Sequence, residues 1–595
     1  HARNDWLRQQ LPSGQRRVVS GKLEVFDGLA QMVHPDFITS VNDAATIPQI
    51  EPVYPLTAGI TQKTITKAIS SAMGRVPDLP EWIEASVLEA KQWPSWKEAV
   101  FDTHNPKKLS DIAINAKPRE RLAYDEFLAH QTTLALARLN NRKKKGYKTV
   151  GTGVLRNKVM ADLPYTLTGA QSRSITEITD DMAGENRMSR LLQGDVGSGK
   201  TLVAFFALLA AIEAGGQGVM MAPTEILARQ HLAALLPLAN DAGVVLEILT
   251  GRDKGRERQA KLAALAKGDI QILVGTHAVF QKDVEFQRLR LAIIDEQHRF
   301  GVRQRMSLGA KGDAVDVLVM TATPIPRSLE LSHYGDMDIS VLDEKPKGRK
   351  PIETVLVSNT RMDQVVARLK AAIEDGRQAY WVCPLVEESE LVDFAAAEDR
   401  YRSLRLALGD KAVGLVHGQM PNSQKDAAMA AFASGDTSVL VATTVIEVGV
   451  DVPNASIMVI EQAEHFGLAQ LHQLRGRVGR GSQASTCLLM YAAPLGATAE
   501  RRLTVMRNTN DGFEISEEDL KLRGAGDLLG TAQSGLAKFR IGDLETQTDL
   551  MKTALDDARM LIHTDPKLVT PRGKAIRTLL FLMEQDIAIR LLTVG

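Results

Sequence analysis

The sequence predicts a multidomain α/β protein whose centre consists of two tandem, doubly wound parallel sheets. From about residue 160, short apolar segments alternate with helical stretches, as they do when helices cover both faces of a parallel sheet. The alternation restarts after Lys345–Gly348, which we interpret as a linker. Between a short apolar strand and a helical run, Gly194–Thr201 matches the phosphate-binding pattern G-x-x-x-x-G-K-[ST]. Because a chain of 595 residues is too long for one hydrophobic core, about three to five domains are expected.

The predicted strands fall into two groups, one on each side of the linker. In the first sheet they are 218–222, 244–249, 270–274, 291–294 and 317–320, with a short strand at Leu191 and Leu192 before the phosphate-binding pattern. In the second sheet they are 379–383, 413–416, 439–441, 457–460 and 487–491. Only the first group contains a phosphate-binding pattern, so the two domains are expected to differ in role.

Composition and charge are those of an ordinary globular chain, with 44% hydrophobic and 24% charged residues. A net charge of zero neither requires nor excludes nucleic acid, because local basic surfaces can be balanced elsewhere. Cys383 and Cys487 lie in apolar runs and are interpreted as buried thiols in a reducing compartment. The longest apolar run, 203–212, is too short to span a bilayer. The chain begins at His1 without an initiator Met, so we expect it to lack an N-terminal part.

The segment 1–60 is expected to be all-β. Its strand-like stretches are 17–26, interrupted by a glycine, then 29–33 and 53–56. Short strands between Gly, Pro and Asp turns are typical of a small barrel, and an OB-like barrel is one option.

Helices are predicted on either side of the two sheets. The segment 61–155 is expected to be a helical linker containing one long helix over 118–140. That helix leads into the basic run Arg142–Gly146, for which a solvated helix end and a nucleic-acid contact both stay open. The segment 501–595 is again helical and charged, apart from glycine-dense residues 524–535.

The phosphate-binding pattern predicts a nucleoside triphosphate site. Glycines allow a tight turn whose N–H groups point inward as an anion nest. The residues of this nest are Gly194, Gly197, Ser198 and Gly199. Lys200 is placed to reach the β- and γ-phosphates, and Thr201 to ligate Mg²⁺. The helix that follows, 202–213, directs its positive N-terminus toward the phosphates.

Two carboxylates follow a predicted strand about one hundred residues later. Asp295 is expected to hold Mg²⁺ through a water molecule, and Glu296 to activate the attacking water. A solvated strand end is the plain alternative. The order after the phosphate-binding loop favours a catalytic pair.

The second α/β domain carries basic residues at fixed spacing. Arg477 and Arg480 are predicted arginine fingers that reach the γ-phosphate when the two domains close. A surface patch is the alternative. Closure on nucleotide and opening after hydrolysis would convert chemical energy into motion.

Taken together, the motifs resemble those of superfamily 2 helicases, whose two domains are RecA-like. The motifs that carry this resemblance are Leu167–Gln171, Ala222–Gln230, Gly275–Ala278, Thr321–Arg327, Val416–Gly418 and Thr443–Asp451. Within the superfamily, Asp295–Gly301 is similar to the corresponding box of the bacterial RecG family. The segments 511–515 and 519–524, leading to Gln533–Gly535, resemble the translocation (TRG) motif of that family. The resemblance extends from about residue 160 to the end and, more weakly, to the N-terminal barrel, which corresponds to the DNA-splitting wedge of that family.

The resemblance implies further roles for individual residues. Gln171 would read adenine, while Arg523 and Gln533 would couple domain movement to DNA. Trp6 lies in the wedge region and is a candidate for base stacking, although a core position is the commoner role of a lone Trp. Ala532 departs from the arginine that the family usually has. Predicted contacts to the DNA backbone are Thr224, Arg229, Thr276, His277, Thr443 and Thr444.

The resemblance also implies a domain plan and an activity. The plan is a partial OB-like wedge over 1–60, the linker 61–155, RecA-like domains over 156–345 and 346–500, and a translocation hairpin over 501–595. The implied activity is ATP- and Mg²⁺-dependent translocation on double-stranded DNA that remodels forks and Holliday junctions. Expected features are a monomer, a bacterial cytoplasmic and nucleoid location, and a single-strand DNA-binding protein as a candidate partner. The alternatives are an RNA helicase of superfamily 2 and a non-catalytic junction-binding scaffold.

Overall fold

The computed structural model describes most of the chain. The described residues are 8–26, 29–33, 35–48, 50–142, 146–295, 314–321, 337–346, 350–384, 390–443, 452, 454–479, 481, 483–528, 539–544, 546–585 and 590. Contacts divide the chain into two compact units. Unit 1 comprises His1–Ala129, Arg540–Gly542 and Lys567–Glu584, and unit 2 comprises His130–Phe539, Asp543–Pro566 and Gln585–Gly595. Each unit is described here by itself.

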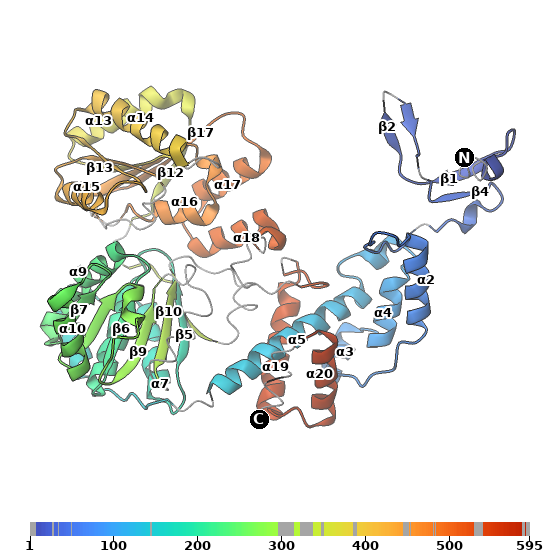
Figure 1. Cartoon of the computed structure of the whole chain (residues 1–595), viewed down its shortest axis with the longest axis horizontal. Coiled ribbons are helices and arrows are strands. Elements are labelled where there is room, and N and C mark those ends of the chain that lie inside the picture. Colours follow the sequence, from blue (N-terminus) through green and yellow to red (C-terminus); the bar gives the residue numbers. More distant parts are fainter. Residues whose placement is uncertain are drawn as a thin grey trace. The chain divides into compact units, whose positions relative to one another are not determined.

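The first sheet of unit 2 is parallel throughout and, with its helices, forms what we call the first lobe (Figure 1). Its strand order among the described residues is β11-β5-β10-β9-β6-β8-β7. The strands are β5 (Ser189–Gly194), β6 (Gln217–Met221), β7 (Leu246–Leu249), β8 (Ile272–Gly275), β9 (Leu289–Ile294), β10 (Asp316–Thr321) and β11 (Asp338–Leu342). The helices are α6 (Val154–Asp162), α7 (Gly169–Ala183), α8 (Lys200–Glu213), α9 (Glu225–Ala242) and α10 (Gly255–Lys267).

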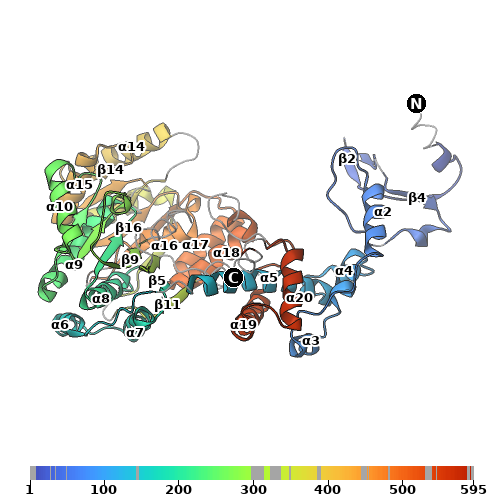
Figure 2. The same ribbon diagram turned by 60° about the horizontal axis from the view of Figure 1, so that its bottom comes forward.

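Both faces of this sheet are buried, which explains why its strands read as continuous apolar runs. Met220 packs with Phe205 of α8 on one face, whereas its neighbours Val219 and Met221 pack with Leu265 of α10 on the other. Alternate residues of a strand point to opposite faces, so an apolar residue is needed at every position. Figure 2 shows α6, α7 and α8 gathered on one side of the sheet.

The second sheet is also parallel and, with its helices, forms the second lobe. The order among its described strands is β12-β17-β16-β13-β15-β14. The strands are β12 (Glu353–Ser358), β13 (Gln378–Val382), β14 (Val413–Val416), β15 (Val439–Ala442), β16 (Ala455–Ile460) and β17 (Thr486–Tyr491). The helices α13 (Met362–Glu374) and α14 (Glu390–Leu408) cover one face. The other face is covered by α15 (Asn422–Ser434), α16 (Leu468–Arg475) and α17 (Ala497–Asn508).

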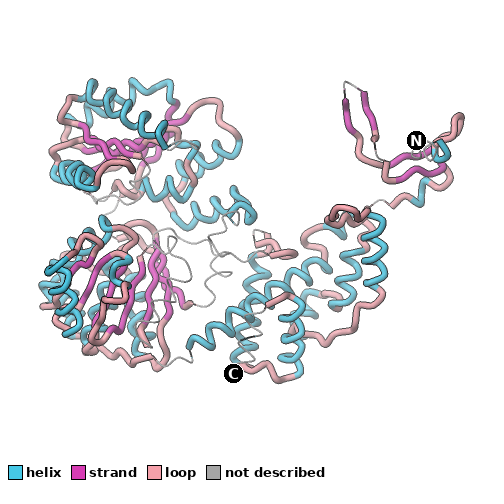
Figure 3. The backbone as a smooth tube through the Cα atoms, in the orientation of Figure 1, coloured by secondary structure: helices cyan, strands magenta, loops and turns pink. Residues whose placement is uncertain are grey.

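Figure 3 shows the strands of each lobe between layers of helix, which confirms the two doubly wound parallel sheets that the sequence predicts. Beyond the second lobe, unit 2 contains α18 (Gly512–Leu528), α19 (Thr548–Thr564) and the C-terminal half of α5 (Lys117–Arg142). The predicted long helix is therefore confirmed. None of the described helices combines the length and apolar character needed to cross a membrane.

Unit 1 combines short antiparallel strands with helices. The strands are β1 (Arg17–Ser20), β2 (Glu24–Phe26), β3 (Leu29–Gln31) and β4 (Phe37–Ser40), with β1 paired to β4 and β2 to β3. The helices are α2 (Gln62–Met73), α3 (Ala85–Lys91), α4 (Trp96–His104), the N-terminal half of α5, and α20 (Pro571–Leu582). The predicted short strands at 17–26 and 29–33, with their break near Gly21, are confirmed, whereas β4 was not predicted and the described pairs do not close into a barrel. The predicted strand 53–56 is wrong, since these residues have no regular structure.

A buried polar cluster fixes the helices of unit 1. The Trp82 indole N–H donates to Asp125 Oδ1 at 2.7 Å, and Arg121 Nε donates to the same oxygen at 3.1 Å. Arg121 Nη2 also donates to Glu81 Oε1 at 2.9 Å. Arg121 and Asp125 are both fully buried, so these protein groups, together with the Pro94 carbonyl that accepts from Arg121 Nη1 at 3.1 Å, take the place of water around them.

The neighbouring Glu126 anchors a distant segment of the chain. Its Oε1 accepts the Arg540 N–H at 2.7 Å, and its Oε2 accepts the N–H groups of Ile541 and Gly542, both at 2.9 Å. Three successive backbone donors converging on one carboxylate form a strong anion-binding nest. The segment 540–542 is thereby held on α5 within unit 1.

Candidate functional site

The phosphate-binding loop follows β5 and leads into α8 at the carboxyl edge of the first sheet, where ligands bind in open parallel sheets. Gly197 and Gly199 have φ of +74° and +90°, the left-handed region that glycine adopts without strain. A Cβ at Gly199 would lie 2.2 Å from Gln171 Nε2, and one at Gly194 would lie 2.6 Å from Ser198 Oγ. The turn therefore needs glycine for space as well as for conformation.

Polar groups of the loop are arranged to receive an anion. Lys200 Nζ donates to the carbonyls of Gly194 at 2.7 Å and Asp195 at 2.9 Å. The Ser198 hydroxyl is buried and has no hydrogen-bond partner among the described residues. Thr201 is the second residue of α8, whose first N–H groups face the same turn. A buried donor lacking a partner, next to a lysine and a helix N-terminus, fits a phosphate oxygen.

Gln171 joins α7 to this loop. Its Oε1 accepts the Thr168 N–H at 3.0 Å, and the Thr168 hydroxyl accepts the Gln171 N–H at 3.2 Å, which forms a capping box. Its Nε2 donates to the Ser198 carbonyl at 2.8 Å. In the structure the amide of Gln171 positions the loop, and its contact with adenine stays a prediction.

Asp295 follows β9 at the same edge of the sheet, with β10 between β9 and the loop strand β5. Its Oδ2 lies 2.8 Å from Nε2 of His231 in α9, and both side chains are buried. His231 thus fixes the orientation of the carboxylate. Glu296 lies outside the described residues.

The second lobe contacts the loop directly. His472 Nε2, in α16, lies 2.6 Å from Asp195 Oδ1, and Lys345 Nζ lies 3.4 Å from Asp195 Oδ2. Burial alone would raise the pKa of Asp195. The hydrogen bond from His472, the charge of Lys345 and the Val196 N–H together hold that pKa well below its usual range. Asp195 is therefore a charged acceptor shared by both lobes.

Of the two predicted arginine fingers, Arg477 is described and Arg480 is not. Arg477 lies in the turn directly after α16, and its side chain is half-buried. The preceding Gly476 packs against Val196 of the loop, and a Cβ at Gly476 would lie 2.8 Å from the Val196 Cβ. The chain segment carrying Arg477 therefore touches the phosphate-binding loop.

The predicted DNA contacts are spread over both lobes. The Thr224 hydroxyl caps α9 by accepting the Leu227 N–H at 3.4 Å, and Arg229 pairs with Glu225 at 2.8 Å. Thr276 and Thr443 are buried, whereas His277 is exposed. Trp6, Thr444 and Gln533 lie outside the described residues, as does the side chain of Arg523.

Sequence reasoning missed the residues that join the lobes, namely Asp195, Lys345 and His472, and it missed Arg475, which contacts His472 within the second lobe. Asp195 occupies a variable position of the phosphate-binding pattern, and His472 lies just before the arginine segment. The one available signal was that Asp195 is a charged residue in an otherwise small and apolar turn. No local pattern pairs it with a histidine 277 positions later.

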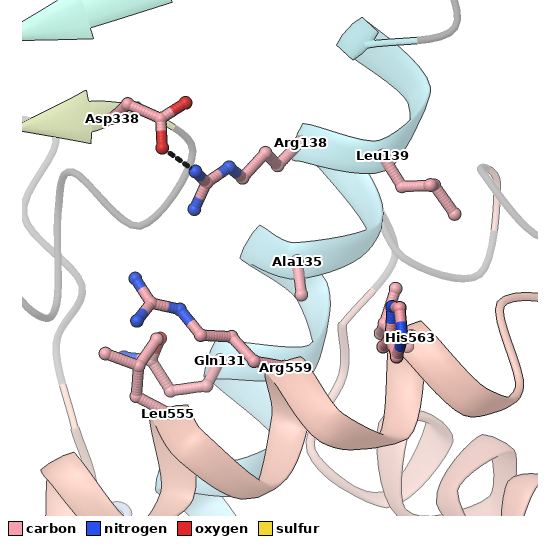
Figure 4. A pocket seen from close by; sticks show the side chains of 9 residues that line it. Gln131, Ala135, Arg138, Leu139, Asp338, Leu555, Arg559 and His563 are labelled. Atoms are coloured by element: carbon pink, nitrogen blue, oxygen red, sulfur yellow. Dashed lines mark hydrogen bonds and ion pairs between the residues drawn. The ribbon is translucent and has the colours of Figure 1, made fainter. Parts of the chain in front are cut away.

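A separate cavity of about 470 Å³ lies between α5, α19 and β11 (Figure 4). Arg138 of α5 pairs with Asp338 at the start of β11, and the side chains of Arg559 and His563 extend from α19 beside it. Leu139 and Leu555 contribute apolar lining. None of its lining residues belongs to the phosphate-binding loop, so the cavity is distinct from the nucleotide site.

Two tandem RecA-like lobes, with a phosphate-binding loop in the first and a direct contact from the second, define a two-lobed P-loop ATPase of the helicase class. Comparison with known proteins agrees. Residues 168–331 match the model of the DEAD/DEAH box helicases, and residues 362–482 match the helicase conserved C-terminal domain. Residues 509–587 match the model described as ATP-dependent DNA helicase RecG, domain 3, C-terminal.

Similar whole proteins point to one family. The ATP-dependent DNA helicase RecG of Escherichia coli strain K12 is 45% identical over 553 residues, covering 90% of this chain and 79% of the relative. That of Bacillus subtilis strain 168 is 43% identical over 580 residues, covering 96% and 83%. A solved structure of RecG bound to a three-way DNA junction has 38% identity and a TM-score of 0.66, covering 92% of this chain and 72% of that one. The chain belongs to the RecG family of ATP-dependent DNA helicases.

Family membership settles the class of activity. The protein is an ATP-dependent DNA helicase. The DNA-helicase interpretation is accordingly favoured over an RNA helicase and over a non-catalytic scaffold.

Proposed function

We propose that the protein uses ATP hydrolysis to move along double-stranded DNA and so remodels branched DNA, namely stalled replication forks and Holliday junctions, in repair and recombination. The observation that carries the proposal is the presence in one chain of a P-loop lobe and a segment matching RecG domain 3. The relative solved with a three-way DNA junction supports the same class of substrate. Phosphate-directed contacts give affinity without sequence specificity, so selection of a branch requires a structural feature such as the wedge.

We assign the phosphates of ATP to the loop residues. Lys200 exchanges its bonds to main-chain carbonyls for bonds to the β- and γ-phosphates, and the Ser198 hydroxyl gains the partner that it lacks among the described residues. Thr201 and Asp295 would hold Mg²⁺, Asp295 through water, with His231 fixing the carboxylate. Mg²⁺ would supply neutralisation of the phosphate charge. Glu296 accepts the proton of the attacking water.

We assign stabilisation of the developing phosphate charge to Arg477 and Arg480. A guanidinium forms two parallel hydrogen bonds to phosphate oxygens and keeps its charge at all working pH values. Because Gly476 packs against Val196, a small movement of α16 brings the following turn over the loop. Stabilisation of the phosphate charge would then depend on the relative position of the two lobes, which links hydrolysis to movement.

DNA contacts are assigned to both lobes and to the ends of the chain. The residues proposed to contact the DNA backbone are Thr224, Arg229, Thr276, His277, Thr443 and Thr444. Arg523 and Gln533 belong to the coupling network, and Trp6 to a wedge within 1–60. The proposed domains are 1–60, 61–155, 156–345, 346–500 and 501–595. We further propose that the protein acts as a monomer at the bacterial nucleoid, with a single-strand DNA-binding protein as a partner.

The proposal is tested by ATP turnover with no nucleic acid, single-stranded DNA, linear duplex, forked DNA and RNA. We expect the strongest stimulation with forked or junction DNA. Stimulation by RNA alone would contradict the proposal and support the RNA-helicase alternative.

Lys200→Ala tests whether ATP hydrolysis and binding of branched DNA use separate sites. The variant removes the charge that contacts the phosphates, so ATP hydrolysis should fall to background while binding to forked DNA persists. Binding is measured by fluorescence anisotropy of a labelled fork, with wild-type protein as the reference. Loss of both properties in a folded variant would show that nucleotide and DNA sites are not separate.

A further inference from the structure

The contact between the lobes is built on Asp195, the second residue of the phosphate-binding loop. Asp195 Oδ1 accepts the Val196 N–H at 2.7 Å and lies 2.6 Å from His472 Nε2 of the second lobe. Asp195 and His472 are 8% and 5% exposed, so water does not compete for this bond. One side chain of the ATP site is therefore held by the other lobe.

The hydrogen bonds around His472 define which ring nitrogen faces each partner. Arg475 Nη2 lies 3.1 Å from His472 Nδ1, and a guanidinium only donates hydrogen bonds. Nδ1 therefore accepts from Arg475, and Nε2 donates to Asp195. The imidazole thus joins a buried guanidinium in the second lobe to a carboxylate in the first.

Arg475 continues the chain of contacts toward the following helices. It is 2% exposed, and its Nη1 donates to the carbonyls of Met506 and Thr509, each at 2.8 Å. These carbonyls lie at the end of α17 and directly before α18. Burial lowers the pKa of Arg475. The two carbonyls accept the hydrogen bonds that water would accept from an exposed guanidinium.

Lys345 provides a second chain of contacts between Asp195 and the residues after α17. Its Nζ lies 3.4 Å from Asp195 Oδ2 and donates to the Asn510 carbonyl at 2.9 Å. Both routes start at one carboxylate and end within residues 506–510. That segment lies at the start of the region matching RecG domain 3.

We propose that His472 is a positioning residue that transmits the state of the ATP site to residues 506–510. Lys200 donates to the main-chain carbonyl of Asp195, so a phosphate that competes for Lys200 acts directly on the Asp195 backbone. The Asp195 side chain passes that displacement to His472, and Arg475 passes it to the carbonyls of 506 and 509. The inference rests on the proposed function, in which hydrolysis drives movement on DNA.

The test compares three variants with the wild type. His472→Ala removes both hydrogen bonds of the ring, whereas His472→Gln keeps one donor and one acceptor. His465→Ala is the matched control, because His465 is an exposed histidine of the same lobe. For each variant, ATP turnover is measured without DNA and with saturating forked DNA. Movement is measured as third-strand displacement from a triplex per ATP hydrolysed.

His472→Ala should lower the fork-stimulated kcat and the displacement per ATP by about tenfold, as expected for loss of a hydrogen bond to a charged group. Its KM for ATP should change less than its fork-stimulated kcat, since the contacts of the loop with the phosphates are themselves kept. His472→Gln should keep most of the stimulation of ATP turnover by forked DNA, and His465→Ala should keep all of it. A merely structural histidine would not separate kcat from KM in this way.

The inference would be overturned if folded His472→Ala showed the same stimulation by forked DNA and the same third-strand displacement per ATP as the wild type. A second measurement does not depend on that variant folding. In the wild type, a non-hydrolysable ATP analogue should change amide hydrogen exchange at residues 506–510, and no change there would also overturn the inference. A wild type that DNA does not stimulate would instead contradict the proposed function itself.

Discussion

Asp316, at the first position of β10, is a buried carboxyl group whose ionisation should affect stability. It is 1% exposed, and its Oδ1 accepts the Met188 N–H at 2.7 Å. Burial raises the pKa of Asp316 to about 7, against the opposing hydrogen bond from Met188 and the charge of Arg187. Between about pH 4 and 7 the folded state therefore holds a proton that the unfolded state releases. Stability from this group is lost as pH rises through that window.

Asp316→Asn removes the titration but keeps an oxygen for the Met188 N–H. We expect the thermal unfolding midpoint to exceed that of the wild type by more at pH 8 than at pH 5, where only part of the loss has occurred. The difference at pH 8 should be on the order of 2–4 kcal/mol in the free energy of unfolding. Asp410→Asn, at an exposed carboxylate, is the control and should show no such trend. An equal effect of Asp316→Asn at both pH values would contradict this explanation.

At the residue scale, sequence identifies side chains whose role depends on their immediate neighbours. Lys200, Ser198 and the loop glycines are brought together by one turn, so a local pattern suffices to predict them. His472 and Arg475 act through contacts that exist only after both sheets have folded. Gln171 lies between these cases, because its capping box is local but its bond to the Ser198 carbonyl is not.

At the element scale, the interior strands were predictable because both faces of each sheet are buried. The strands β11 and β12 were missed, and both lie at sheet edges where burial is less complete. The predicted strand 53–56 is wrong because Pro52 and Pro55 lack the N–H groups that a ladder needs. Val53 is accordingly 83% exposed.

The nest around Glu126 yields a prediction about how α5 holds the segment 540–542. Glu126→Ala leaves three backbone N–H groups without their acceptor, at a cost of about 2–4 kcal/mol in local stability. Amide hydrogen exchange of residues 540–542 should accelerate strongly in this variant. Glu584→Ala is the matched control, because Glu584 pairs with the exposed side chain of Arg540 and not with its backbone. Unchanged protection in Glu126→Ala would mean that other contacts hold the segment.

At the scale of the whole molecule, the described contacts of the phosphate-binding loop all lie within one of the two units. Every contact described at that site, including those of Asp195, Asp295 and His472, lies within unit 2, whereas residues 1–60 lie in unit 1. Removal of residues 1–60 should leave ATP turnover without DNA within about twofold of the full chain. Preference for forked over linear DNA should fall, because we propose the wedge there. Retained fork preference, measured from ATPase stimulation, would place branch selection elsewhere.

The division into units also has a consequence for the covalent chain. The polypeptide passes between the units after residues 129, 539, 542, 566 and 584. A protease that cuts once, after residue 129, 539, 542 or 566, leaves two fragments that both contribute residues to the same unit, so packing within that unit still holds them together. The fragments should therefore co-elute under native conditions and separate only in denaturant. Neither unit corresponds to one continuous stretch of sequence, so dividing the gene at a single position cannot yield the two units as independent proteins.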